Sequence, residues 1–159
     1  MAKAKSAVPD GYHTLTPELM LENAAQTIDW YKKALGVEEL NRFVGPDGKI
    51  MHAELKVGNS RFMVGEVMAG HKGPKALGGS PASMWLYVEN SDAVFNKAVS
   101  AGGKVQMPMA DQFWGDRAGS FIDPAGYVWW VATHSEDLSK EELHHRADEF
   151  FKQPQHVTR

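Results

Sequence analysis

The residues with the clearest potential for chemistry are a histidine and a glutamate two positions apart, in the segment Met51-His52-Ala53-Glu54-Leu55. Side chains two positions apart in a strand point to the same face, so this imidazole and carboxylate would lie side by side. With one distant histidine as a third ligand, His52 and Glu54 could bind a divalent metal, or Glu54 could act as a general base. The alternative is a hydrogen-bonded polar pair without chemistry, which is the more common role of such residues.

Three tryptophans form a second set of candidate ligand-binding residues: Trp85, Trp114 and Trp130. Strand alternation separates Trp130 from its neighbour Trp129, so the two indoles face opposite sides of a sheet. Exposed indole faces favour a planar or cationic ligand. The alternative is that these indoles pack on one another and act as core.

For two further side chains, Arg117 and His134, the sequence leaves open which face of the sheet they occupy. Arg117, in Gly115-Asp116-Arg117, could hold an anionic ligand group by two hydrogen bonds, and a structural salt bridge is the alternative. His134 has the same parity as Trp130, but we expect the strand to end at Thr133, before His134.

An internal repeat indicates how these residues are positioned. Leu19-Met20-Leu21-Glu22-Asn23 recurs 67 residues later as Leu86-Tyr87-Val88-Glu89-Asn90, and the same offset pairs Ala34 with Ala101 and Gly36 with Gly103. Each copy predicts a strand followed by a helix that an asparagine side chain caps and a glycine ends.

After each helix the chain predicts three strands, so each half reads β-α-β-β-β. The predicted strands are 38–44, 49–57 and 61–67 in the first half, and 104–110, 116–122 and 127–133 in the second.

A helix is predicted near the C-terminus, because Ser139 and Glu142 have capping-box spacing and Pro154 ends the segment. One apolar stripe of this helix should dock on the domain or on a second subunit: Leu143, Ala147, Phe150 and Phe151. The predicted organisation is a flexible N-terminus (1–11), a first module (12–67), a connector (68–82), a second module (83–134), and a C-terminal helix and tail (135–159).

Composition excludes several classes of protein. The 159 residues contain no cysteine, which rules out disulfides, thiolate metal sites and a cysteine nucleophile. Seventeen basic against 20 acidic residues, a net charge of −3, indicate neither a nucleic-acid partner nor a membrane-surface anchor. No signal peptide or spanning segment is expected, and we predict a cytoplasmic protein.

Several motifs together carry a family resemblance over roughly residues 12–146. They are Thr16-Pro17-Glu18-Leu19, Ile28-Asp29-Trp30-Tyr31, Ala34-Leu35-Gly36, Met51-His52-Ala53-Glu54-Leu55, Gly78-Gly79-Ser80-Pro81, Leu86-Tyr87-Val88, Asp111-Gln112-Phe113-Trp114-Gly115-Asp116-Arg117, Asp123-Pro124 and Ala132-Thr133-His134. The chain resembles the vicinal-oxygen-chelate superfamily, which contains glyoxalase I, the bleomycin resistance proteins and the extradiol dioxygenases, and within it the PhnB-like branch. The resemblance implies an α+β fold in which two β-α-β-β-β modules form curled mixed sheets around a ligand cavity, a C-terminal helix, and a homodimer.

The resemblance also implies positions for a divalent metal, normally filled by histidine and glutamate. Mapped onto this chain, these positions fall at Thr16 and Glu54 in the first module and at Ser83 and Trp130 in the second. Of these four residues, only Glu54 has a suitable side chain. A catalytic ion needs about three protein ligands, so the set is incomplete. We therefore expect a degenerate site with no bound metal and no cofactor.

The favoured function is a small-molecule-binding protein that takes a planar or aromatic ligand in an aromatic-lined cup. The predicted ligand-binding residues are His52, Glu54, Trp85, Trp114, Arg117 and Trp130. The resemblance leaves a metal-dependent lyase, isomerase or thiol transferase that uses Glu54 as the alternative. A third possibility is a non-catalytic protein whose aromatic cup is simply core.

Overall fold

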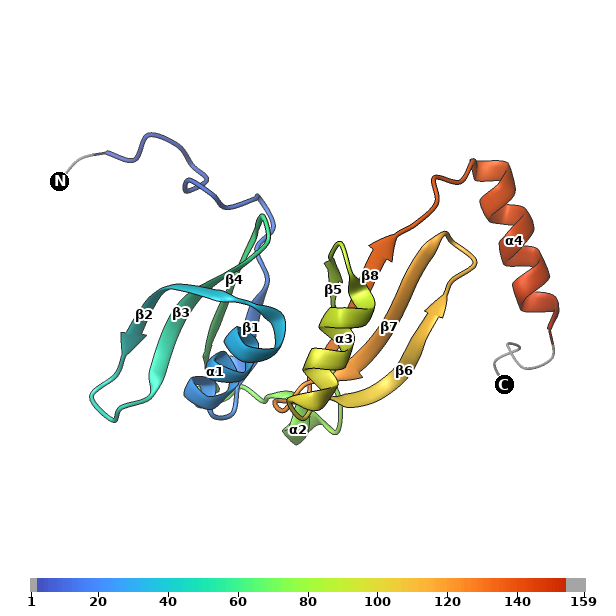
Figure 1. Cartoon of the computed structure of the whole chain (residues 1–159). Coiled ribbons are helices and arrows are strands. Elements are labelled where there is room, and N and C mark those ends of the chain that lie inside the picture. The colour runs from blue at the N-terminus through green and yellow to red at the C-terminus, as the bar shows by residue number, and fades with distance from the viewer. Residues whose placement is uncertain (1–2, 154–159) are drawn as a thin grey trace. The chain divides into compact units, whose positions relative to one another are not determined.

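The computed structural model describes residues 3–153, and they form two compact units (Figure 1). The first unit runs to Pro81 and includes the short segment Pro124–Tyr127. The second unit contains Ala82–Asp123 and the chain from Val128 onward. No helix among the described residues is long and apolar enough to cross a membrane.

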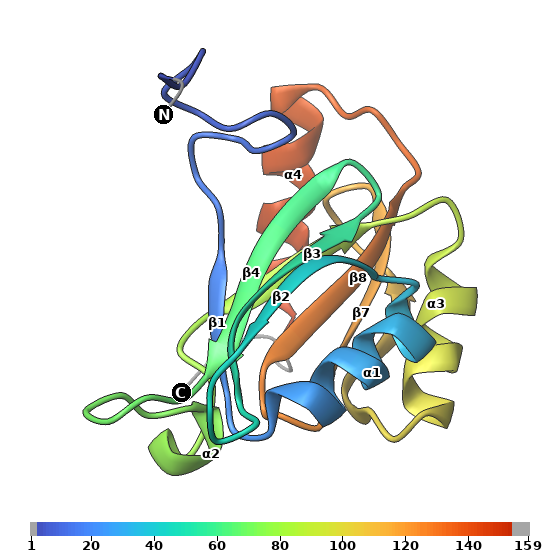
Figure 2. The same ribbon diagram turned by 90° about the vertical axis from the view of Figure 1, so that its left-hand side faces the viewer.

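The first unit is a four-stranded sheet with one long helix on one face (Figures 1 and 2). Its elements are β1 (Glu18–Leu21), α1 (Ala24–Leu35), β2 (Glu38–Val44), β3 (Ile50–Val57), β4 (Ser60–Glu66) and the short α2 (Pro74–Leu77). The strand order is β1-β4-β3-β2, with β1 parallel to β4 and the other neighbours antiparallel.

The second unit repeats this arrangement. Its elements are β5 (Ser83–Tyr87), α3 (Ser91–Ser100), β6 (Lys104–Asp111), β7 (Asp116–Ile122), β8 (Val128–His134) and α4 (Lys140–Lys152). The strand order is β5-β8-β7-β6, with β5 parallel to β8. The predicted α+β fold of two β-α-β-β-β modules followed by a C-terminal helix is therefore confirmed.

Most of the large buried apolar side chains lie on the helix-bearing face of each sheet. Strand alternation sends every second side chain toward the helix. In the first unit these include Leu19, Leu21, Leu55, Phe62 and Val64, packed with Ile28 and Tyr31 of α1. In the second unit they include Leu86, Phe121, Trp129 and Val131, packed with Phe95 of α3. The opposite, open face of each sheet carries the residues discussed below.

The helix ends differ in part from the prediction. The Asn90 side chain caps α3 by accepting a hydrogen bond from the backbone N–H of Ala93, as expected. Asn23 does not cap α1, because its backbone is left-handed and its side chain donates to Gln26 instead. Gly36 ends α1 in the left-handed conformation, whereas after α3 the positive φ falls on Gly102 rather than Gly103.

The last strand extends further than predicted. β8 runs to His134, which lies opposite Asp116 in the antiparallel ladder with β7. The predicted end at Thr133 is wrong because the ladder continues for as long as β7 does, and β7 begins at Asp116.

The C-terminal helix begins as predicted, with the Ser139 hydroxyl accepting from the backbone N–H of Glu142. Its two phenylalanines, Phe150 and Phe151, contact the ring of Phe113 in the β6–β7 loop, at centroid distances of 4.9 and 6.0 Å. The apolar stripe thus docks on its own unit in part, although no residue of the helix is buried. Pro154 lies outside the described residues.

We predict that Phe121→Ala destabilises the protein by about 3–5 kcal/mol, because it leaves a cavity under α3 where the ring is fully buried against Phe95. Urea unfolding monitored by circular dichroism measures the free energy of unfolding. Val105→Ala on β6, where half of the side chain is exposed, is the matched control and should change it by less than about 0.5 kcal/mol. Equal effects of the two substitutions would contradict this description of the core.

Candidate functional site

The open face of the second sheet brings together aromatic and polar side chains from neighbouring strands. The ladder sets Trp85 of β5 opposite Trp130 of β8, and Asp116 of β7 opposite His134. Side chains in register at alternate positions share a face, so these four residues lie on the side away from α3. Trp129, one residue from Trp130, is buried on the helix-bearing face, so the predicted separation of the two indoles is confirmed.

Two indoles at this face form a stacked pair. The rings of Trp85 and Trp130 lie 4.8 Å apart between centroids and are inclined by only 11°. Trp114 from the β6–β7 loop approaches Trp85 to 6.2 Å in a tilted arrangement. The three predicted tryptophans are therefore neighbours within one unit. Trp85 keeps 42% of its surface exposed despite the stacking, so the pair presents aromatic surface to solvent.

A buried carboxylate lies beside this aromatic surface. Asp116 is only 3% exposed and accepts three side-chain hydrogen bonds. The Tyr87 hydroxyl (2.9 Å) and the Trp114 indole N–H (3.0 Å) donate to Oδ2, and Nδ1 of His134 lies 2.8 Å from Oδ1. These bonds compensate the cost of burying a charge and connect β5, β7, β8 and the β6–β7 loop.

The same carboxylate raises the pKa of two of its neighbours. The pKa of Tyr87 is raised by desolvation of the Tyr87 hydroxyl and by its hydrogen bond to Asp116, although the residue as a whole is largely exposed. The hydrogen bonds to Asp116 and then to Asp137 raise the pKa of His134, because both carboxylates favour the imidazolium. Nε2 of His134 lies 3.0 Å from Oδ1 of Asp137.

Asp116 and His134 are absent from the predicted site. A strand that ends at Thr133 leaves His134 outside the sheet, and in the sequence Asp116 stands out only as the neighbour of Arg117. Its parity with Trp130 is the signal that identifies His134, once the strand is extended by one residue.

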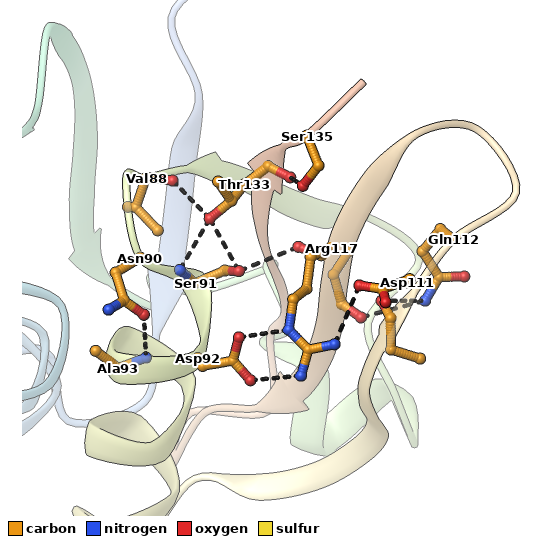
Figure 3. A network of polar contacts seen from close by, with 12 residues as sticks. Val88, Asn90, Ser91, Asp92, Ala93, Asp111, Gln112, Arg117, Thr133 and Ser135 are labelled. Atoms are coloured by element: carbon orange, nitrogen blue, oxygen red, sulfur yellow. Dashed lines mark hydrogen bonds and ion pairs between the residues drawn. The ribbon is translucent and has the colours of Figure 1, made fainter. Parts of the chain in front are cut away.

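Arg117 lies on the other face of the sheet. Its guanidinium donates to Oδ1 of Asp92 on α3 (2.7 Å) and to Oδ1 of Asp111 on β6 (3.1 Å), as Figure 3 shows. Ser91 and Thr133 form a hydrogen-bonded network on the same face. The ion pairs raise the pKa of Arg117 and lower that of Asp92. Of the two roles considered for Arg117, this geometry supports the structural salt bridge, and the ligand proposal below does not use it.

His52 and Glu54 lie in the first unit, on the open face of its sheet. Nε2 of His52 is 4.0 Å from Oε1 of Glu54, which is an ion-pair distance and too long for a hydrogen bond. The guanidinium of Arg61 lies over the ring of Tyr12, 4.9 Å from its centroid. Desolvation and the Glu54 carboxylate raise the pKa of Tyr12. Glu54 therefore belongs to a small polar cluster contributed by β3, β4 and the segment before β1.

The ladders correct one assignment of the metal positions. Glu54 lies on β3 opposite Met63, while Trp130 lies on the last strand, β8, opposite Ser120. The counterpart of Trp130 is therefore Met63, and the counterpart of Glu54 is Ser120, so the assumed equivalence of Glu54 and Trp130 is wrong. The offset of 67 that relates Thr16 to Ser83 also relates Met63 to Trp130, and this could have revealed the error.

The corrected positions, Thr16, Met63, Ser83 and Trp130, do not fit a divalent cation. They offer two neutral hydroxyls, a thioether and an indole, whereas such ions select imidazole nitrogen and carboxylate oxygen. The Thr16 hydroxyl donates to the backbone carbonyl of His13. Across residues 3–153, no three His, Cys, Asp or Glu side chains come together in a metal-binding arrangement.

Comparison with known proteins identifies the family. The model of the Glyoxalase/Bleomycin resistance protein/Dioxygenase superfamily matches residues 13–131, which span all the elements from β1 to most of β8. The chain belongs to this superfamily. Two mycobacterial relatives, Mb0911c of Mycobacterium bovis and Rv0887c of Mycobacterium tuberculosis, are each 38% identical over 81% of this chain, covering 88% and 79% of their own lengths.

Solved structures agree with the superfamily fold. The Arabidopsis thaliana At5g48480 gene product is 25% identical with a TM-score of 0.64, over 76% of this chain and 98% of its own. Protein PA1353 of Pseudomonas aeruginosa is 27% identical with a TM-score of 0.62, over 78% of this chain and 99% of its own. A PhnB protein of Bacillus cereus is 19% identical with a TM-score of 0.61, over 76% and 99%, which shows the fold alone.

We predict that the pKa of His134 lies above the ordinary value of about 6.5 and that Asp116→Asn lowers it more than Asp137→Asn, because the bond to Asp116 is the larger cause. Titration of the imidazole protons by NMR measures it. Since the folded-state pKa is raised, the stabilisation by His134 is complete below the unfolded pKa and lost as pH rises through the folded pKa. An unshifted His134 in the wild type would contradict the geometry around Asp116.

Proposed function

We propose that this superfamily member is a small-molecule-binding protein that takes a planar ligand against the stacked indoles of Trp85 and Trp130. The observation that supports this proposal is a stacked pair that remains partly exposed, with Trp114 beside it. A planar ring gains about 0.5–1.5 kcal/mol from each aromatic partner beyond the area that it buries. Bleomycin resistance proteins, one of the groups that name the superfamily, give a precedent for binding without catalysis.

The exposure of the indoles distinguishes ligand-binding tryptophans from tryptophans that only pack in the core. Indoles that act only as core are buried, as Trp129 is under α3 at 3% exposure. Trp85 and Trp130 stack on each other, yet Trp85 stays 42% exposed and Trp130 is only partly buried. Their hydrogen-bonded neighbours, Trp114 and Tyr87, are fixed by Asp116, so the surface is pre-organised.

A catalytic role through Glu54 has weaker support, because the metal positions lack a suitable donor set and Glu54 lies among Tyr12, His52 and Arg61 in the first unit. His52 and Glu54 stay predicted as ligand contacts of that unit. The cytoplasmic location, the PhnB-like assignment and the homodimer also stay predictions.

We predict that Trp130→Ala weakens binding of a planar aromatic compound, such as 2-naphthoate, at least about tenfold and changes stability less than a core substitution would, because the residue is only partly buried. Isothermal titration calorimetry and thermal unfolding measure the two effects. The matched control is Trp129→Phe, at the preceding residue, whose side chain lies on the opposite, helix-bearing face of the sheet. It removes a buried hydrogen bond to Asp123, so it should lower stability and preserve binding. The reverse pattern would show that Trp130 is core.

We predict that Ni²⁺, Zn²⁺ or Mn²⁺ produces no thermal stabilisation that depends on Glu54, since Glu54 lies outside the corrected metal positions and none of those positions offers an imidazole or a carboxylate. Thermal unfolding of the wild type and Glu54→Gln with each metal, together with metal analysis of the purified protein, measures this. A stoichiometric ion that is lost in Glu54→Gln would support the lyase, isomerase or thiol transferase alternative and overturn our proposal.

A further inference from the structure

We propose that His134, held by the buried Asp116, binds an anionic group of the ligand, so that the ligand class is a planar aromatic molecule carrying a carboxylate or similar anion. This inference rests on the proposed function, because it assigns the charged end of a ligand whose rings lie on the indoles. The sequence prediction included neither residue, and the structure places both at one end of the open face.

The position of His134 makes it continuous with the aromatic surface. Trp114 and Tyr87 each contact the ring of Trp85 at 6.2 Å between centroids, and each donates a hydrogen bond to Asp116. Asp116 in turn contacts His134 at 2.8 Å. His134 follows Trp130 by four residues on the same face, about 13 Å along the strand. A planar molecule with a short side arm spans such a separation.

The imidazole is fixed on one side and open on the other. Asp116 is 3% exposed, and its bond to Nδ1 orients the ring and favours the imidazolium. Nε2 faces Asp137, whose side chain is fully exposed, and the side chain of His134 is itself 54% exposed. An ion pair between two exposed groups contributes little, so an incoming anion can replace Asp137 at Nε2.

An anion fits this end of the face better than a cation does. The Asp116 carboxylate would be the natural partner of a cation, but Tyr87, Trp114 and His134 already occupy its oxygens. The charged and titratable groups around the imidazole are Asp116 from β7, Tyr87 from β5 through that carboxylate, and Asp137 after the end of β8. Once Asp137 is displaced, Nε2–H is the remaining donor that points outward.

The test compares 3-(2-naphthyl)propanoate with its primary amide by isothermal titration calorimetry, since the two probes differ in charge but barely in shape. In the wild type at about pH 6 we expect the carboxylate to bind about tenfold more tightly than the amide. This preference should disappear as pH rises above the pKa of His134 and should be absent in His134→Gln at every pH. His144→Gln, on exposed α4, is the matched control and should retain the preference.

Asp137→Asn separates direct recognition from a merely structural role of His134. The substitution removes the charge that competes for Nε2, so at about pH 6 the carboxylate should bind at least as tightly as to the wild type, while the amide is unaffected. Loss of carboxylate binding in Asp137→Asn would overturn the inference. Equal binding of the two probes by the wild type would also overturn it and leave the proposed function intact, whereas binding of neither probe would overturn both.

Discussion

The arrangement of the candidate site depends on one buried carboxylate. A buried charged group is tolerated only when its hydrogen-bonding capacity is satisfied. Asp116 accepts three side-chain hydrogen bonds, from Tyr87, Trp114 and His134. These donors come from two strands and a loop that are far apart in the sequence. Their bonds hold the Tyr87 and Trp114 rings beside Trp85. The same carboxylate is also the largest cause of the raised pKa of His134.

The duplicated fold explains how one topology carries two different surfaces. Both units use the same strand order and bury the helix-bearing face, so the core requirements of the two halves are alike. The open faces are not constrained in this way. At equivalent register the first unit places Glu54 and Met63, and the second places Ser120 and Trp130. The chain thus keeps the superfamily scaffold while its mapped metal positions carry hydroxyl, thioether and indole groups that do not suit a cation.

Much of the fold could be predicted from the sequence because local signals agree with the repeat. Strands 38–44 and 116–122 have the predicted bounds, and the parity of Trp129 and Trp130 is correct. The errors arise where tertiary partners decide. Glu66 accepts the backbone N–H of Asn23, whose left-handed conformation directs the side chain away from the helix N–H groups. Glu54 lies on the third strand of its unit and Trp130 on the last strand of the other, so the assumed equivalence of the two paired strands that do not correspond. The Asp116 network joins residues that are far apart in the sequence, and no local sequence pattern predicts it.

The most direct measurement of the central claim is the ¹H–¹⁵N NMR spectrum of the five tryptophan indoles during titration with 2-naphthoate, because each indole N–H reports its own environment. The account predicts that the signals of Trp85, Trp114 and Trp130 shift together with a single affinity, while those of the buried Trp30 and Trp129 stay in place. Shifts confined to Trp30 or Trp129, or saturation of Trp85, Trp114 and Trp130 at different concentrations, would contradict a single ligand-binding surface on the second sheet.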